Sequence, residues 1–335
     1  MGRTRINREG ADRLMANLIL THQCNQQCPF CFTGFATQKT NRAMVSLERY
    51  REMLSFLRVN NVPQIRLLGG EPTLHPLFTE ILHLAQQENK PIIIFSNGLI
   101  PDSALEEIID ASSTASIIAL ININVYFQNS SSSKVSGRIE QVLARLGGNC
   151  QLGYTVHTHQ LPAMEIYELI NQYGLIKSLR LGLAQPIGRN NQYLHPRSYP
   201  LIGEKIIDAA RNAMHNTIKI ELDCGFVRCM FPGNSRAIFS EANASPAFHC
   251  NPIIDLDVDG SALACFPLSQ ELRLPVALDH PGEEIINFFN SRLQDLRRLG
   301  IYTECSQCAY LAAQKCSGGC LAMILNRFHN IKRSK

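Results

Sequence analysis

The fold of this chain of 335 residues is indicated above all by the stretch Cys24-Asn25-Gln26-Gln27-Cys28-Pro29-Phe30-Cys31. It follows an apolar run, Leu18 to Leu20, that is typical of a buried strand, so the cysteines are expected on the loop after that strand. A [4Fe–4S] cluster normally takes four cysteines, so three thiolates on one short loop predict a cluster with one iron left open. A zinc knuckle is the alternative, but three cysteines without a nearby fourth ligand make a poor tetrahedral site.

The first half of the chain alternates apolar, strand-like runs with amphipathic, helix-like segments. Unbroken apolar strands separated by helices indicate an α/β fold with a parallel sheet covered by helices. The periodicity alone allows a partial barrel or an open, doubly wound sheet. The expected strands are Met15–His22, Ile65–Leu68, Pro91–Phe95, Ile117–Val125, Gln151–His157 and Leu179–Leu183. The expected helices are Ser46–Val59, Leu77–Gln87, one opened by a capping box at Ser103–Glu106, Val135–Leu146 and Met164–Tyr173.

The composition narrows the class of protein. No apolar run is long enough to span a membrane and the charged N-terminus lacks a signal-peptide core, so a cytoplasmic protein without a membrane partner is expected. The formal net charge of +4 is too small to predict a nucleic-acid partner. Twelve cysteines in an unexported chain point to metal rather than to disulfides. Cys150, alone in a probable strand, is expected to be a buried hydrophobic residue.

Gly69-Gly70-Glu71-Pro72 follows the second expected strand, at the carboxyl end where parallel α/β folds bind ligands. Together with the cysteine loop, this tetrapeptide resembles the signature of the radical S-adenosylmethionine (SAM) enzymes. The resemblance implies a partial (β/α)6 TIM barrel in which Cys24, Cys28 and Cys31 hold a [4Fe–4S] cluster. The open iron of that cluster would chelate SAM, whose reductive cleavage yields a 5′-deoxyadenosyl radical that abstracts a substrate hydrogen.

The resemblance also assigns residues to SAM binding. Polar side chains that end the third and fourth strands are similar to those that contact SAM in the family. Turn chemistry and satisfied strand ends are the alternative explanations for them. The implied SAM-binding residues are Phe30, Gly69, Gly70, Glu71, Pro72, Ser96, Asn97, Asn122 and Asn124.

The cysteines near the C-terminus form a second pattern. Cys250 precedes Gly260-x4-Cys265, and Cys305-x2-Cys308 precedes Cys316-Ser-Gly-Gly-Cys320. This order resembles the SPASM extension of radical SAM enzymes, which carries auxiliary [4Fe–4S] clusters and often acts on peptides. Two zinc ribbons would need similar spacings. By family order, one cluster takes Cys250, Cys265, Cys320 and one upstream cysteine, and the other takes Cys305, Cys308 and Cys316.

The chain departs from that pattern in its ligand count. No cysteine follows Cys320, so the second auxiliary cluster is expected to lack one ligand unless His329 or an exogenous group completes it. Cys308 and Cys316 are also separated by two residues more than is usual in the family.

Upstream, the segment that begins Asp223-Cys224 and ends at Cys229 offers two cysteines where one is needed. We assign Cys229 to the metal and Cys224 to the return of a hydrogen atom to a substrate radical. Asp223 would orient the substrate or move a proton. The alternatives are that both cysteines bind metal, or that one is buried and inert.

The sequence therefore predicts an N-terminal tail (1–14), a radical SAM core barrel (15–198) and a linker with a small, irregular α+β SPASM-like domain (199–335). The leading hypothesis is an enzyme that abstracts hydrogen from a ribosomally made peptide, followed by epimerisation to a D-residue or by oxidative crosslinking. A flavodoxin- or ferredoxin-type protein would donate the electron. The alternatives are a radical SAM dehydrogenase or epimerase acting on a small molecule such as an amino sugar, and a non-catalytic zinc or electron-transfer protein.

Overall fold

A computed structural model describes most of the chain. The described residues are 14–31, 43–128, 133–187, 191–233, 235–242, 248–250, 253–269 and 271–333, with side chains described up to residue 327. The predicted tail falls on residues 1–13, which lie outside this set, and so does the side chain of His329. In the described part of the chain no helix is long and apolar enough to cross a membrane.

The described residues contain ten strands in one sheet, in the order β10-β9-β8-β1-β2-β3-β4-β5-β6-β7. Neighbours from β8 round to β7 run parallel, whereas β9 pairs antiparallel with both β8 and β10. The strands are β1 (Ala16–Ile19), β2 (Ile65–Leu68), β3 (Ile92–Ser96), β4 (Ile117–Asn122), β5 (Cys150–Val156), β6 (Ser178–Leu183), β7 (Lys219–Leu222), β8 (Ile254–Leu256), β9 (Ala262–Leu263) and β10 (Arg273–Leu274).

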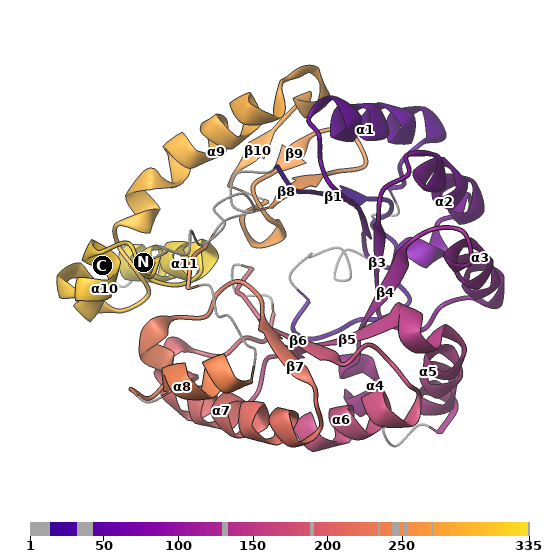
Figure 1. The fold of residues 1–335 in the computed structure, drawn as a ribbon. Helices are drawn as coiled ribbons and strands as arrows, with labels where there is room; N and C mark the ends of the chain where they lie inside the picture. The colour runs from indigo at the N-terminus through magenta and orange to yellow at the C-terminus, as the bar shows by residue number, and fades with distance from the viewer. Residues whose placement is uncertain are drawn as a thin grey trace, which may run out of the picture.

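The helices lie on the outside of the curved sheet, and Figure 1 shows α1, α2, α3, α5, α6, α7 and α8 following one another round it. The last helices, α9 to α11, lie beyond the β8–β10 edge in the same view. The helices are α1 (Leu47–Val59), α2 (Phe78–Gln87), α3 (Asp102–Ser112), α4 (Asn124–Gln128), α5 (Ser133–Leu146), α6 (Ala163–Gln172), α7 (Tyr199–His215), α8 (Ser235–Glu241), α9 (Gly282–Arg297), α10 (Ala309–Ala312) and α11 (Leu321–Arg333).

The strands present different residues to their two faces. Ile65 and Leu67 of β2 are fully buried in the large apolar core that the strands share with the helices. Successive side chains of a strand point to opposite faces, so Arg66 between them faces the inside of the barrel. The same alternation places Arg180 of β6 on the inner face, because Leu179 and Leu181 belong to the apolar core. The inner face therefore carries the polar side chains of the molecule's centre.

The six predicted βα units and the parallel sheet are confirmed. Cys150 is fully buried at the start of β5, as expected. Beyond residue 198 the sheet continues, with β7 beside β6 and β8 beside β1. Neither strand was predicted, because β7 has the sequence Lys-Ile-Glu-Leu and β8 the sequence Ile-Asp-Leu, so neither forms the unbroken apolar run that marked the other strands. The proposed domain boundary at residue 198 stays a prediction.

The predicted capping box at Ser103–Glu106 is wrong. Helix α3 begins one residue earlier, at Asp102, with Pro101 as its N-cap and no side chain bonded to the cap. Glu106 instead accepts hydrogen bonds from Arg145 of α5, at 2.7 and 2.5 Å. Because Glu106 faces α5, it is not available to bond the backbone at the start of its own helix.

Candidate functional site

The cysteine loop is held by the Gly-Gly-Glu segment after β2. The amide of Gly70 donates to the carbonyl of Thr21 and the amide of Glu71 donates to the carbonyl of Gln23, both at 2.8 Å. These bonds continue the pairing of β1 with β2 beyond the strands themselves. The tetrapeptide predicted to bind SAM thus also fixes the path of the chain into the cysteine loop.

Gly69 and Gly70 are required by the close approach of these two backbones. A Cβ on Gly69 would lie 2.6 Å from the carbonyl oxygen of Thr21. A Cβ on Gly70 would overlap the carbonyl group of Gln23 and lie 2.9 Å from the carbonyl oxygen of His22. The resemblance implied that these glycines bind SAM. In the structure their missing side chains make room for the backbone that leads into the chain's own cysteine loop.

Glu71 is fully buried and joins the ends of β2 and β3. Its Oε1 accepts from the hydroxyl of Thr73 at 2.7 Å and from the Thr73 amide at 3.4 Å. Its Oε2 accepts from the Asn97 amide at 2.8 Å and from the Ser96 hydroxyl at 3.1 Å. Burial raises the pKa of the carboxyl group, and these bonds oppose the rise. Four donors match the acceptor capacity of one carboxylate, so a contact from Glu71 to the SAM ammonium stays a prediction.

The three loop thiols lie close enough for their charges to interact. Burial, with smaller effects from neighbouring charges, raises the pKa of Cys24 to about 11 and that of Cys28 to about 12. Cys31 contributes to both shifts, and Asn97 donates to the Cys24 sulfur at 3.7 Å. Buried thiols of this kind need a positive centre to become thiolates, which an iron–sulfur cluster provides. The donor set therefore fits the predicted cluster.

No three His, Cys, Asp or Glu side chains of the described residues converge on a point where one metal ion would sit. A [4Fe–4S] cluster needs no such point, because each of its thiolates binds a different iron.

Phe30 and Asn97 flank the cysteine loop. The Phe30 ring is buried against the imidazole of His157, with centroids 4.4 Å apart, and His157 follows β5. Asn97 Nδ2 also donates to Asn25 Oδ1 at 2.7 Å, so it ties the end of β3 to the loop. His157 was not among the residues predicted for the site, although its place directly after a strand was a signal. Pro72 begins a short 3-10 turn after Glu71.

The asparagines after β4 are occupied by the protein. Asn124 is 1% exposed, and its amide group both donates to the Thr155 carbonyl and accepts from the Thr155 amide. Asn122 donates to the Thr155 hydroxyl at 2.9 Å and accepts from the Asn124 amide. These bonds favour the satisfied strand end that was the alternative explanation. SAM binding by either residue stays a prediction.

The eight cysteines after residue 220 fall into two sets of four, according to which thiol charges raise each other's pKa. The charges of Cys250 and Cys320 raise the pKa of Cys224, and the charges of Cys224, Cys250 and Cys320 raise the pKa of Cys265. The pKa of Cys229 is raised instead by the charges of Cys305, Cys308 and Cys316. The first set is therefore Cys224, Cys250, Cys265 and Cys320, and the second is Cys229, Cys305, Cys308 and Cys316. The second set has a fourth thiol that the sequence pattern did not place there.

Three thiols of the second set line a cavity of about 660 Å³. Cys305, Cys308 and Cys316 are among its lining residues, and Cys250 of the first set reaches it as well. The additional residues between Cys308 and Cys316 are taken up by the short helix α10. Cys316 accepts from the amide of Gly318 at 3.3 Å, a bond to sulfur of the kind that tunes cluster ligands.

Cys224 follows β7 and its side chain is accessible to water. The atoms packed around the thiol nevertheless raise its pKa well above the usual value. Asp223 beside it forms an ion pair with Arg180 at 2.7 Å, on the inner face of the barrel. The charges of Cys320 and Cys250 contribute to the raised pKa of Cys224. Its role as a hydrogen donor stays a prediction.

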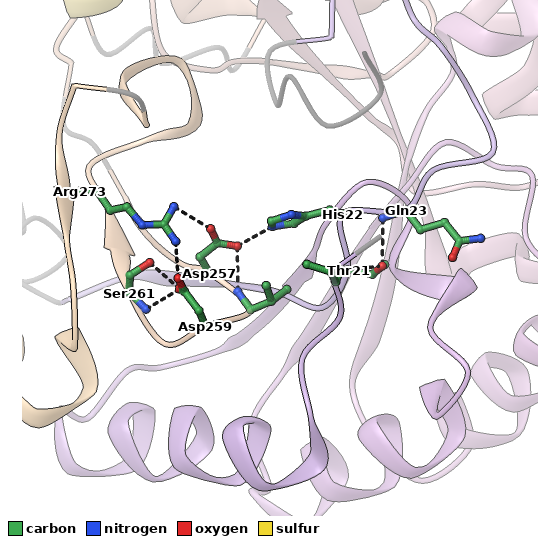
Figure 2. A network of polar contacts seen from close by, with 9 residues as sticks. Thr21, His22, Gln23, Asp257, Asp259, Ser261 and Arg273 are labelled. Atoms are coloured by element: carbon green, nitrogen blue, oxygen red, sulfur yellow. Dashed lines mark hydrogen bonds and ion pairs between the residues drawn. The ribbon is translucent and has the colours of Figure 1, made fainter. Parts of the chain in front are cut away.

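A polar network joins the cysteine loop to the β8–β9 turn, as Figure 2 shows. His22, two residues before Cys24, contacts Asp257 with Nε2 at 2.7 Å from Oδ1. The other oxygen of Asp257 pairs with Arg273 at 3.0 Å, and Arg273 pairs with Asp259 at 2.6 Å. The His22 and Asp257 side chains are 7% and 2% exposed, so this contact is shielded from water. Sequence reasoning missed this network.

Replacing Asp257 by Asn is expected to loosen the cysteine loop. The substitution removes a buried charge from between His22 and Arg273, at a cost of about 1–3 kcal/mol. We expect faster release of iron from the reconstituted protein to a chelator under anaerobic conditions. Asp259→Asn is the matched control, because Asp259 pairs with the same arginine but is exposed, so its effect should stay below about 1 kcal/mol. Equal release rates in the two variants would contradict the expectation.

Comparison with known proteins agrees with this geometry. Residues 18–146 match the model of the Radical SAM superfamily. The GTP 3′,8-cyclase of Synechocystis sp. is 31% identical over 107 residues, which cover 32% of this chain and 33% of that protein. The subtilosin biosynthesis protein AlbA of Bacillus subtilis is 31% identical over 85 residues, 25% of this chain and 18% of that protein. The chain thus matches a third or less of these curated relatives.

Two solved structures share the fold over nearly the whole chain. Streptococcus suis SuiB bound to its precursor peptide SuiA has a TM-score of 0.63 at 14% identity, covering 92% of this chain and 72% of that chain. The enzyme anSMEcpe with bound AdoMet and a peptide has a TM-score of 0.61 at 18% identity, covering 91% and 88%. The matched superfamily implies a [4Fe–4S] cluster and SAM as cofactors, which confirms the predicted cofactors of the loop.

Proposed function

Because residues 18–146 of this chain form a radical SAM domain, we propose that the protein oxidises a peptide substrate with the help of two auxiliary [4Fe–4S] clusters. Each auxiliary cluster would be held by four cysteines. Cys224, Cys250, Cys265 and Cys320 would bind the first. Cys229, Cys305, Cys308 and Cys316 would bind the second.

The observation that carries the proposal is the division of the eight thiols into two complete sets. Epimerisation by the predicted route needs a free thiol at Cys224 to return a hydrogen atom. The charges of Cys320 and Cys250 raise the pKa of Cys224, which supports grouping it with them and leaves no cysteine spare in this proposal. Two fully ligated clusters are suited to electron transfer, because no iron is left open to bind substrate. Removal of an electron from a substrate radical gives an oxidised product.

The peptide assignment has separate support. The fold resembles that of SuiB bound to a precursor peptide over 92% of this chain. The match to AlbA, a protein of bacteriocin biosynthesis, points the same way. An electron donor of the flavodoxin or ferredoxin type and a ribosomal origin of the peptide remain parts of the proposal.

The chain's own residues have definable tasks in this proposal. Cys24, Cys28 and Cys31 would hold the first cluster, which together with SAM supplies the hydrogen-abstracting radical chemistry. Asn97 donates to the Cys24 sulfur, and Glu71 fixes the ends of β2 and β3 beside the loop. The net change in the substrate is the loss of two hydrogen atoms, counted as two electrons and two protons. Asp223, next to Cys224 on the inner face, would accept the proton that is not removed with the first electron.

The test is anaerobic turnover in D2O with reconstituted protein, SAM, a reductant and the short peptide encoded nearest the gene. A product two mass units lighter is expected, and Cys24→Ala should abolish it. A product one unit heavier, with deuterium on carbon, would mean epimerisation and would contradict the oxidative proposal. Cleavage of SAM without change in the peptide would contradict the peptide assignment.

A further inference from the structure

The inside of the barrel contains an arginine whose buried Nε has no hydrogen-bond partner among the described residues. Arg66 of β2 is 7% exposed, and its Nε is buried with no partner. Among the described residues, no side chain lies within ion-pair or hydrogen-bonding distance of this guanidinium. Buried polar groups of native proteins are nearly always bonded, so an exception of this kind calls for a ligand.

Phe95 of β3 supports the Arg66 side chain. The guanidinium carbon of Arg66 lies 5.0 Å from the centroid of the Phe95 ring, and that of Arg180 lies 5.5 Å from the same centroid. A cation over an aromatic face is stabilised without a hydrogen bond. The N–H groups of a guanidinium lie in its plane, so a contact with the ring face leaves them available. They can form bidentate hydrogen bonds to a carboxylate or a phosphate.

The acids near Arg66 compensate its charge only in part. Asp223 is committed to Arg180 at 2.7 Å. Asp255 of β8 accepts from Asn17 at 2.5 Å, and burial raises its pKa to about 7, so it carries only part of a charge near neutral pH. Burial and the Arg180 charge lower the pKa of Arg66 to about 10, which still leaves it protonated. The barrel thus holds an excess of positive charge at this point.

We propose that Arg66, supported by Phe95 and assisted by Arg180, binds an oxyanion of the substrate inside the barrel. The oxyanion is a carboxylate or a phosphate. This inference rests on the proposed function and deepens it, since a peptide substrate would supply the carboxylate of an acidic residue or of its C-terminus. Arg66 lies on the strand that leads into Gly69-Gly70-Glu71, and Arg180 pairs with Asp223, the neighbour of Cys224. The two arginines therefore lie between the segment that holds the cysteine loop and the segment that carries Cys224.

The test measures binding without turnover, using anaerobically reconstituted protein and no reductant. Two matched pairs of probes are titrated by calorimetry, acetyl-Gly-Glu-Gly-amide against its Gln counterpart, and AMP against adenosine. We expect the anionic member of one pair to bind about 10-fold more tightly than its neutral partner. The pair that responds identifies the oxyanion as carboxylate or phosphate.

Arg66→Gln should abolish this preference for the anion. Arg58→Gln should retain it, because Arg58 forms an exposed pair with Glu88 far from the barrel's inner face. Arg66→Met serves as a second variant, and the unfolding temperature of both Arg66 variants should rise, since an unpaired buried charge destabilises the fold. Equal binding of the members within both pairs in the unmodified protein, or a preference that survives in both Arg66 variants, would overturn the proposal. Since SAM cleavage plays no part, a failure of peptide oxidation would leave this result standing.

Discussion

Cys229→Ser is expected to remove one auxiliary cluster and leave the other two clusters in place. Three [4Fe–4S] clusters correspond to about 12 irons per chain, so the variant should retain about 8. The reason is that Cys229 supplies the fourth thiol to Cys305, Cys308 and Cys316. Iron and acid-labile sulfide, measured after anaerobic reconstitution, test this directly. Cys224→Ser should cause an equal loss by removing a ligand of the other set.

Cys150→Ala is the matched control for these variants. Cys150 is fully buried in the apolar core at the start of β5, away from either set of thiols, and its loss should leave the iron content unchanged. Full iron in Cys229→Ser together with a loss in His329→Ala would show that the histidine, not Cys229, completes the second set. Full iron in Cys224→Ser, with a loss of deuterium incorporation from D2O, would restore Cys224 as a hydrogen donor.

Gly70→Ala is expected to reduce SAM cleavage by about 100-fold or more. The new Cβ would overlap the carbonyl group of Gln23, which is backbone and has no rotamer to change. The segment after β2 and the cysteine loop would therefore have to separate, which displaces Cys24 from the other ligands. A shift of about 1 Å in a catalytic arrangement is enough for a loss of this size. Methionine release from SAM by the reconstituted variant measures it.

Gly137→Ala provides the comparison. Gly137 lies within helix α5, and no atom stands within 4 Å of the position of its added Cβ. Alanine should stabilise this helix by about 0.5–1 kcal/mol and leave SAM cleavage unchanged. If both variants cleave SAM at the unmodified rate, the close contact between Gly70 and the loop is not needed for the site.

The cysteine loop and the six βα units were predictable because their signals are local. A strand such as Ile65–Leu68 is read from consecutive residues, and the Gly-Gly-Glu-Pro segment is placed by the strand that precedes it. Arg66, which lies between Ile65 and Leu67 in an otherwise apolar strand, could also have been noticed in the sequence. It was not predicted as a site residue, because a sequence does not show whether a buried arginine has an acidic or hydrogen-bonding partner on a neighbouring strand.

The distribution of the thiols could not be read from spacing. Cys224 and Cys229 lie on one short segment after β7, and their separation along the chain suggests a single site. The backbone between them turns through Gly225, which has a φ of +96°, and a short 3-10 helix, so the two sulfurs reach different groups. The same limit applies to β7 and β8, whose places in the sheet depend on residues far away in sequence.

The pairing of β1 with β8 determines when, during synthesis, the strand that carries the cysteine loop acquires neighbours on both sides. Asn17 meets Asp255 across 238 positions of sequence, so the ribosome completes most of the chain before this neighbour exists. Until then β1 is the edge of the growing sheet, and an open edge invites pairing with other chains. Contacts so distant in sequence also slow folding. Assembly of iron at Cys24 on a paired β1 therefore has to wait until the chain has been made beyond residue 256, and a chain truncated before residue 254 would present the loop on an unpaired edge strand.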